Sequence, residues 1–371
     1  MSAQSEPQAP TVKAPTFTGG DRLLWADCAK GMSIIAVCYM HVVTGVPGAT
    51  ETAWSWLNDV MDPVRMPMFF LVSGLFAHRV IERTLGDLWY RRLWFLLVPY
   101  LVFTPFVSAT RLVIDDNFSV PTLLRTIIVG DPGVWFLYVL MVFNILACLT
   151  RRLPPLAAVA LSVIPAFVVA LTGMAGYNEI THITQYLPAF FLGLHFRAVF
   201  LRLATLAKDV RVIVAVAVLY IGWEWLHGTV GDHLALGGWT ASDDSVMSLM
   251  DLVRTVTAVP LAIVVAVWIS WIPGIRRVFA AIGRNTLPIY VSHQIFLYLV
   301  NVRLLPWLAQ YDPDTFGVVM ELHQQVVLGL LTCALSGYVF YLLGKVPFIR
   351  WILYPPPLLR RPRRHPRVET D

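Results

Sequence analysis

The sequence predicts an all-α, polytopic membrane protein built as a bundle of about ten transmembrane helices. Hydrophobic residues make up 57% of its 371 positions and charged residues only 14%, and the mean hydropathy is +0.66. A water-soluble domain of this length cannot bury so much apolar surface. The apolar residues also fall into runs of about 20, the length that crosses a hydrocarbon core of about 30 Å.

Ten apolar runs follow one another along the chain. They lie near residues 28–47, 61–79, 93–113, 134–150, 156–173, 184–201, 210–227, 249–271, 286–304 and 324–344. The third run contains two prolines, at which we expect a kink. The connections are too short for a separate soluble domain, so residues 21–345 form one membrane domain. Any chemistry therefore takes place in the membrane or at its faces.

The two ends of the chain differ in composition from this domain. Residues 1–20 are rich in Ser, Pro, Gln and Thr and are expected to form a disordered cytoplasmic tail. They lack the basic start and apolar core of a signal peptide, so the first apolar run is expected to be retained. Residues 346–371 are predicted to be a basic, Pro/Arg-rich cytoplasmic tail, and its charges serve either to orient the chain or to bind anionic lipids.

Positive charges are distributed unevenly between the two sides of the predicted bundle. All but five of the 28 lysines and arginines fall in the terminal tails and the even-numbered connections. The five exceptions are Arg65, Arg111, Arg125, Arg254 and Arg303. Because basic residues accumulate on the cytoplasmic side, both termini are expected in the cytoplasm. This distribution accounts for the net charge of +5, so we expect no nucleic-acid partner.

The first predicted span and the residue just before it carry three ionisable residues, which are costly at membrane depth and therefore candidates for function. Lys30 and His41 are eleven residues apart, so they lie on nearly the same helix face, separated by about 16 Å along the axis. Asp27 lies close to that face, three residues before Lys30. Ordinary interfacial roles for Asp27 and Lys30, and a helix–helix hydrogen bond for His41, remain the alternatives.

Other polar residues lie in the second, seventh and ninth spans. Ser73 and Gly74 allow either another backbone or a ligand to approach closely. Tyr290 and His293, at i and i+3, share one face of the ninth span. Glu224, between two tryptophans, either orients a histidine or extends towards the outer interface.

Several other kinds of chemistry lack support in the sequence. The four cysteines are Cys28, Cys38, Cys148 and Cys333; all lie in apolar segments, so we interpret them as packing residues. There is no HExxH, phosphate-binding loop, dinucleotide-binding glycine pattern or GxSxG elbow. The histidines are too scattered for a metal site, and we expect none.

An ordered set of motifs resembles the membrane acyltransferase-3 family over residues 21–345. The motifs are DCAKG with His41 in the first span, MPMFFLVSG in the second, RRLWFLLVPY before the third, WFLYVL in the fourth, YLPAFFLG in the sixth and GRNTLPIYVSH in the ninth. Members of this family have about ten helices and transfer acyl groups, usually acetyl, to hydroxyls of sugars and lipids at the cell envelope.

The resemblance implies roles for particular residues. His41 matches the family's essential histidine, and Lys30 replaces the arginine that usually precedes it, as in the subgroup similar to fucose 4-O-acetylases. Arg91 and Arg92 resemble the cytoplasmic basic residues, but Trp94 and Phe95 partly replace the usual paired arginines before the proline of the third helix. Tyr290 and His293 match the motif of the ninth helix.

Together these features predict an O-acyltransferase that uses cytoplasmic acetyl-CoA. Lys30, Arg91 and Arg92, with Asp27 beside them, would face the donor phosphates, and His41 would act as general base. A developing oxyanion would receive hydrogen bonds from Tyr290, His293 or Ser73. Direct transfer is favoured over an acyl-enzyme intermediate, because no nucleophile–base pair is evident.

The sequence leaves other functions open. A proton-coupled transporter or flippase would also carry intramembrane His, Lys and Glu residues. A non-catalytic scaffold would need none of these residues. If the protein is an acyltransferase, its donor is either acetyl-CoA or a longer acyl-CoA such as succinyl-CoA. The expected acceptor is an extracytoplasmic saccharide or glycolipid. We expect the protein in a bacterial cytoplasmic membrane among its lipids, and the sequence does not indicate an oligomeric state.

Overall fold

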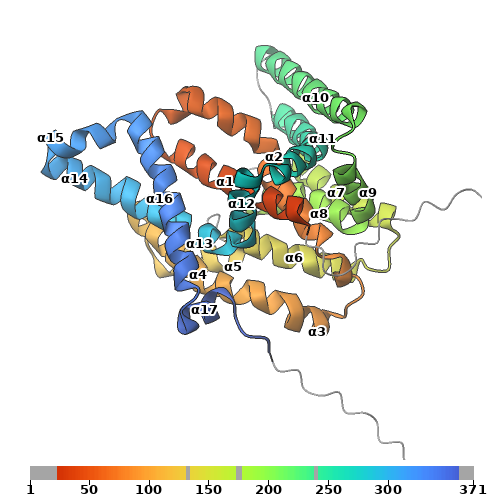
Figure 1. Cartoon of the computed structure of the whole chain (residues 1–371), viewed down its shortest axis with the longest axis horizontal. Helices are drawn as coiled ribbons and strands as arrows, with labels where there is room; N and C mark the ends of the chain where they lie inside the picture. Colours follow the sequence, from red (N-terminus) through yellow and green to blue (C-terminus); the bar gives the residue numbers. More distant parts are fainter. Residues whose placement is uncertain (1–22, 131–133, 173–177, 238–240, 359–371) are drawn as a thin grey trace, which may run out of the picture.

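The computed structural model describes residues 23–130, 134–172, 178–237 and 241–358, and the regular elements in these ranges are all helices (Figure 1). The α-helices are α1 Leu24–Gly45, α2 Ala53–Leu75, α3 Leu85–Leu88, α4 Trp94–Ile114, α5 Val120–Val129, α6 Trp135–Leu149, α7 Pro155–Thr172, α8 Asn178–His195, α9 Arg197–Thr205, α10 Val210–Gly237, α11 Ala241–Trp271, α12 Pro273–Arg284, α13 Thr286–Leu297, α14 Leu305–Tyr311, α15 Pro313–Phe316, α16 Leu322–Leu343 and α17 Pro347–Leu353. Short π-helices, Trp89–Leu93 and Tyr298–Leu304, lead into α4 and out of α13.

Helices overlap all ten predicted spans. By length and apolar composition, six of the described helices qualify to cross a membrane. They are Leu24–Gly45, Leu85–Ile114, Pro155–Thr172, Val210–Leu236, Ser245–Trp271 and Leu322–Leu343. Ile183–His195 and Arg197–Thr205, which meet at a 77° bend, make a seventh if they are one broken span. The all-helical class is confirmed for the described residues, whereas ten crossings and cytoplasmic termini stay predictions.

Helix α1 packs against α12 through glycines. A β-carbon on Gly283 of α12 would lie 1.8 Å from the carbonyl oxygen of Asp27 and 2.8 Å from the backbone nitrogen of Gly31. Real β-carbons do not approach backbone atoms this closely. The two backbones are therefore in direct contact, and this contact fixes the start of α1, where Asp27 and Lys30 lie.

A second close contact joins α2 to α8. A β-carbon on Gly74 would lie 2.1 Å from the carbonyl oxygen of Phe190, and one on Gly193 would lie 2.1 Å from that of Leu71. Of the two alternatives for Gly74, the structure therefore supports the approach of another backbone. This contact holds α2 against α8 and fixes the position of the C-terminal end of α2, residues 73–76, in the bundle.

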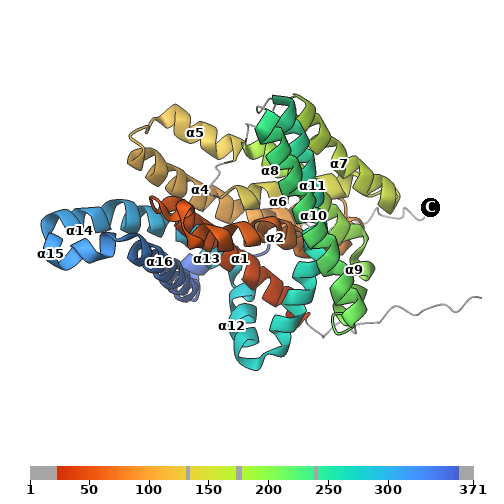
Figure 2. The same cartoon turned by 90° about the horizontal axis from the view of Figure 1, so that it is seen from above.

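Basic elements lie together at one edge of the bundle. In Figure 2, α9 and α12 lie at the lower edge and α5 at the upper edge. The arginines on α9 and α12 are Arg197, Arg202, Arg276, Arg277 and Arg284, whereas α5 carries only Arg125. This arrangement agrees with the charge distribution from which the orientation was predicted.

The predicted C-terminal tail begins as ordered structure. Helix α17 inserts Leu353, which is 1% exposed, against Phe103 of α4 and Val291 of α13. Beyond it, the carbonyl oxygen of Pro356 accepts a hydrogen bond from the Trp94 indole Nε1–H at 3.1 Å. The C-terminal segment is thus attached to the start of α4. The predicted tail 1–20 and the rest of the C-terminal tail, 359–371, lie outside the described residues.

Candidate active site

A group of charged residues gathers around the C-terminal end of α2. The Lys30 ammonium lies 3.1 Å from an Asp27 carboxylate oxygen and 5.5 Å from the centre of the Phe76 ring. Arg92 approaches the same end of α2, where its guanidinium donates to the carbonyl oxygens of Phe76 (3.3 Å) and Ser73 (3.4 Å). Lys30, Asp27 and Arg92 therefore lie together around the end of α2.

Arg91 points elsewhere, into a cleft of about 400 Å³. The residues lining the cleft are Arg83, Tyr90, Arg91, Phe95, Pro357 and Leu358. Burial, together with the positive charges of Arg91 and Arg79, lowers the pKa of the Arg83 guanidinium. Like charges held this close repel one another, so a bound anion would stabilise the cleft. The C-terminal segment forms one wall.

An apolar cavity of about 200 Å³ lies deeper in the bundle. Phe95 lines both this cavity and the basic cleft. Side chains of α1, α2, α6 and α13 complete the lining, among them Val37, Met66, Phe136 and Tyr290. The Tyr290 hydroxyl accepts a hydrogen bond from the Phe136 backbone N–H at 2.9 Å. The cavity thus extends from Phe95, at the start of α4, to Tyr290 in the motif of the ninth span.

His41 and the ninth-span motif meet at membrane depth. The rings of His41 and His293 have centres 5.2 Å apart, and the ring of Tyr290 lies 6.1 Å from that of His293. The Gln294 amide Nε2 lies 3.0 Å from Nε2 of His41. The predicted proximity of His41, Tyr290 and His293 was not derivable from spacing in one helix, and the packing of α1 against α13 produces it.

The hydrogen bonding of His293 limits its role. Its Nδ1–H donates to the carbonyl oxygen of Ile289 at 3.0 Å, because a carbonyl can only accept. Its Nε2 is buried and has no hydrogen-bond partner among the described residues. When the ring is neutral, Nε2 therefore carries a lone pair and no proton, so it can accept a proton but cannot donate one to an oxyanion. The geometry therefore favours His293 as a proton acceptor or as a ring packed beside His41.

A third cavity, also about 200 Å³, lies on the far side of His41. Its polar lining includes His41, Thr44, Gln294, Tyr298 and Asn301. The linked rings of His41, His293 and Tyr290 thus stand between an apolar cavity and a polar one. Sequence reasoning missed Gln294 and Asn301. Both are polar residues inside an apolar span, and that signal marks them as candidates.

Ser73 does not join this group. Its carbonyl oxygen accepts a hydrogen bond from Arg92 at the C-terminal end of α2. The other end of α2 follows the η1 turn, Ala49–Glu51, which connects it to α1. The structure therefore places Ser73 with the basic residues. A role for its hydroxyl beside His41 has no support in these contacts.

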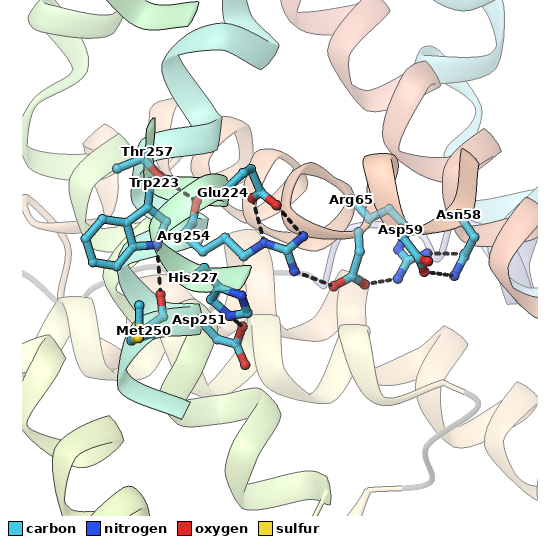
Figure 3. A network of polar contacts seen from close by, with 11 residues as sticks. Asn58, Asp59, Arg65, Trp223, Glu224, His227, Met250, Asp251, Arg254 and Thr257 are labelled. Atoms are coloured by element: carbon cyan, nitrogen blue, oxygen red, sulfur yellow. Dashed lines mark hydrogen bonds and ion pairs between the residues drawn. The ribbon is translucent and has the colours of Figure 1, made fainter. Parts of the chain in front are cut away.

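Glu224 belongs to a separate network of polar contacts (Figure 3). Its two carboxylate oxygens accept from the Arg254 guanidinium at 2.6 and 2.8 Å. Arg254 also lies 3.8 Å from a carboxylate oxygen of Asp62, which bonds Arg65 in turn. His227 pairs with Asp251 at 2.8 Å on the same two helices. Glu224 therefore neutralises an arginine, and neither of its two expected roles is observed.

The described residues contain no group of three or more His, Cys, Asp or Glu side chains placed to hold a metal ion. All four cysteines are buried and form no disulfide, as expected of packing residues.

Comparisons with known proteins agree with the architecture. The profile of the Acyl_transf_3 family, described as "Acyltransferase domain", matches residues 23–342. The chain is 26% identical to "Inner membrane protein YcfT" of Escherichia coli (strain K12), over 90% of this chain and 96% of that protein. No solved structure matches the chain.

Proposed function

The chain belongs to the Acyl_transf_3 family, and on that premise we propose that it is an integral-membrane O-acyltransferase. In this proposal the donor is a cytoplasmic acyl-CoA, most simply acetyl-CoA, and the acceptor is a hydroxyl of an extracytoplasmic saccharide or glycolipid. The observation that carries the proposal is the position of His41, which lines a polar cavity on one side and contacts His293 beside an apolar cavity on the other.

The donor would bind across the basic cleft and the apolar cavity. Its phosphates would lie near Arg83 and Arg91, and its pantetheine arm would pass Phe95, the residue common to both spaces. Forked guanidinium donors suit phosphate oxygens. Lys30 and Arg92 supply further positive charge at the end of α2, and the Asp27 carboxylate holds Lys30 in place.

The reaction is then a direct transfer. His41 removes the proton from the acceptor hydroxyl while the hydroxyl oxygen bonds to the thioester carbonyl carbon. The carbon–sulfur bond breaks, the thiolate leaving group takes the proton from His41, and the products are an ester and free CoA. Tyr290 lines the cavity in which the thioester would lie, and this position supports a role for Tyr290 in orienting the carbonyl.

We place the protein in the cytoplasmic membrane of a bacterium, with both termini in the cytoplasm. The relative named as an inner membrane protein and the number of apolar helices support this location. The clustering of arginines on α9 and α12 supports the orientation.

The test is transfer of label from radioactive acetyl-CoA, and in parallel succinyl-CoA, to the lipid and glycan fractions of inverted membrane vesicles. We expect label that depends on the chain and on one of the two donors. Solute or glycolipid flux without any CoA donor, and with no donor-dependent label, would instead establish a transporter.

Replacing Arg91 with glutamine should raise the KM for the donor by a factor of about 10 to 150 and leave kcat within twofold. The reason is that charge-assisted hydrogen bonds to phosphate contribute about 1.5–3 kcal/mol. The measurement is a donor titration of purified protein. The matched control is Arg152→Gln, in a neighbouring cleft on the α6–α7 connection. Equal KM values for both variants and the wild type would remove Arg91 from the donor site.

A further inference from the structure

Two amide side chains line the polar cavity beside His41 (the outer cavity), and each carries a buried oxygen atom that has no hydrogen-bond partner among the described residues. Gln294 is 6% exposed, and its Oε1 has no hydrogen-bond partner among the described residues. Oδ1 of Asn301 is buried and lacks a partner in the same way. A buried polar atom left without a hydrogen bond destabilises the fold, so each of these two oxygens needs an explanation. Both residues line the cavity that His41 lines.

The cavity is shaped around these amides. Gln294, Leu297, Tyr298 and Asn301 line it with the spacing of a single helix face, and the last two lie in the π-helix that follows α13. Gly329 of α16 leaves room for the Asn301 side chain, since a β-carbon at position 329 would lie 3.0 Å from the Asn301 Nδ2. The amides are thus held on rigid helices, a feature of built binding sites.

The Gln294 amide also reaches the proposed base, because its Nε2 lies 3.0 Å from Nε2 of His41. One end of this amide therefore contacts the imidazole and the other is left for a ligand. A hydroxyl group both donates and accepts, so it can pair with the unsatisfied end whichever of the two amide atoms faces it.

We propose that Gln294 and Asn301 form the acceptor subsite and that its ligand is a polyhydroxy compound, a saccharide unit. Gln294 holds the hydroxyl that gives its proton to His41, and Asn301 Oδ1 accepts a hydrogen bond from a second hydroxyl of the same molecule. This inference rests on the proposed function and assigns acceptor recognition to two residues on one helix face. A monohydric alcohol satisfies only the first amide and leaves Asn301 without a partner.

The test compares two acceptor probes with purified protein in lipid nanodiscs and radioactive acetyl-CoA. The probes are methyl β-D-glucopyranoside and 1-propanol, and the readout is kcat/KM for each. We expect the wild type to prefer the glucoside by tenfold or more. Asn301→Leu should lower kcat/KM for the glucoside about fivefold through KM, since one hydrogen bond is lost, and leave 1-propanol unchanged. Asn301→Ala, a smaller substitution, should behave alike.

The control is Asn144→Leu. Asn144 is also a buried amide whose Oδ1 lacks a partner among the described residues, but it lies on α6 and does not line the cavity. It should keep the wild-type preference. An unchanged glucoside preference in both Asn301 variants, an equal loss on both probes, or a wild type that prefers 1-propanol would each overturn the subsite. A wild type that acylates neither probe nor any membrane acceptor would overturn the proposed function itself.

Discussion

Replacing His41 with alanine should lower the rate of acyl transfer by a factor of about 10²–10⁴, the usual contribution of a positioned general base. His41 is the histidine that lines the outer cavity and contacts both Gln294 and His293. Without His41, no described side chain that lines the outer cavity has an imidazole nitrogen that could take the proton. The loss should fall on kcat, because neither the donor cleft nor Asn301 changes. The measurement is donor-dependent label transfer at saturating acetyl-CoA.

The control for this prediction is His323→Ala, which removes an imidazole that pairs with Trp54 at 2.9 Å, away from the cavity. It should retain activity within a few fold. His41→Gln keeps a polar side chain of similar length and should be as inactive as His41→Ala, since an amide is not a base. Full activity of either His41 variant in normally folded protein would show that His41 is not the base.

Gly283→Ala should be the most damaging single-methyl substitution in the bundle. Its β-carbon would lie 1.8 Å from the Asp27 carbonyl oxygen and 2.8 Å from the Gly31 nitrogen, and both are backbone atoms that no rotamer change can move. Overpacking of this kind costs about 1–3 kcal/mol, and more where backbones must separate. We therefore expect a Tm lower by several degrees or more and a large drop in the yield of folded protein.

The matched control lies on the same helix. A β-carbon on Gly274 would meet nothing within 4 Å, so Gly274→Ala should leave the Tm of the detergent-solubilised protein unchanged. Because the substitution Gly283→Ala forces α1 away from α12, it should also displace Lys30. The fraction of the variant that folds should therefore bind the donor more weakly. Equal Tm values for the two variants would mean that the contact between α1 and α12 is not close.

Much of the fold was predictable because apolar length and lysine/arginine distribution are one-dimensional signals. The positions of the helices follow from them, and the family follows from the ordered motifs. The partners of individual side chains could not be predicted in this way, because they depend on which helices are neighbours. From the sequence we expected Glu224 to orient a histidine or to extend towards the interface, whereas in the structure it pairs with Arg254 of α11. Ser73 was grouped with His41, although its carbonyl lies beside Arg92.

Some residues of the candidate site were also predictable from the sequence, and others were not. His41, Lys30 and the ninth-span pair were found from ionisable residues at membrane depth and from the resemblance. Gln294 and Asn301 were missed because an uncharged amide raises a weaker signal than a charge, and only the packing of α1 against α13 shows that they line a cavity with His41. The divergence of Arg91 and Arg92 was equally hidden, since a π-helix sets their directions.

The pairing of Glu224 with Arg254 bears on how this protein is assembled in the membrane. Each charge alone opposes insertion of its helix by about 2.5–3.5 kcal/mol at the centre of a span. Helices α10 and α11 follow one another in the chain and are joined by this pair. If they leave the insertion machinery together, they present one neutral unit to the lipid. Insertion of α10 would then be favoured when it is accompanied by α11, so the pair would couple the insertion of these two helices.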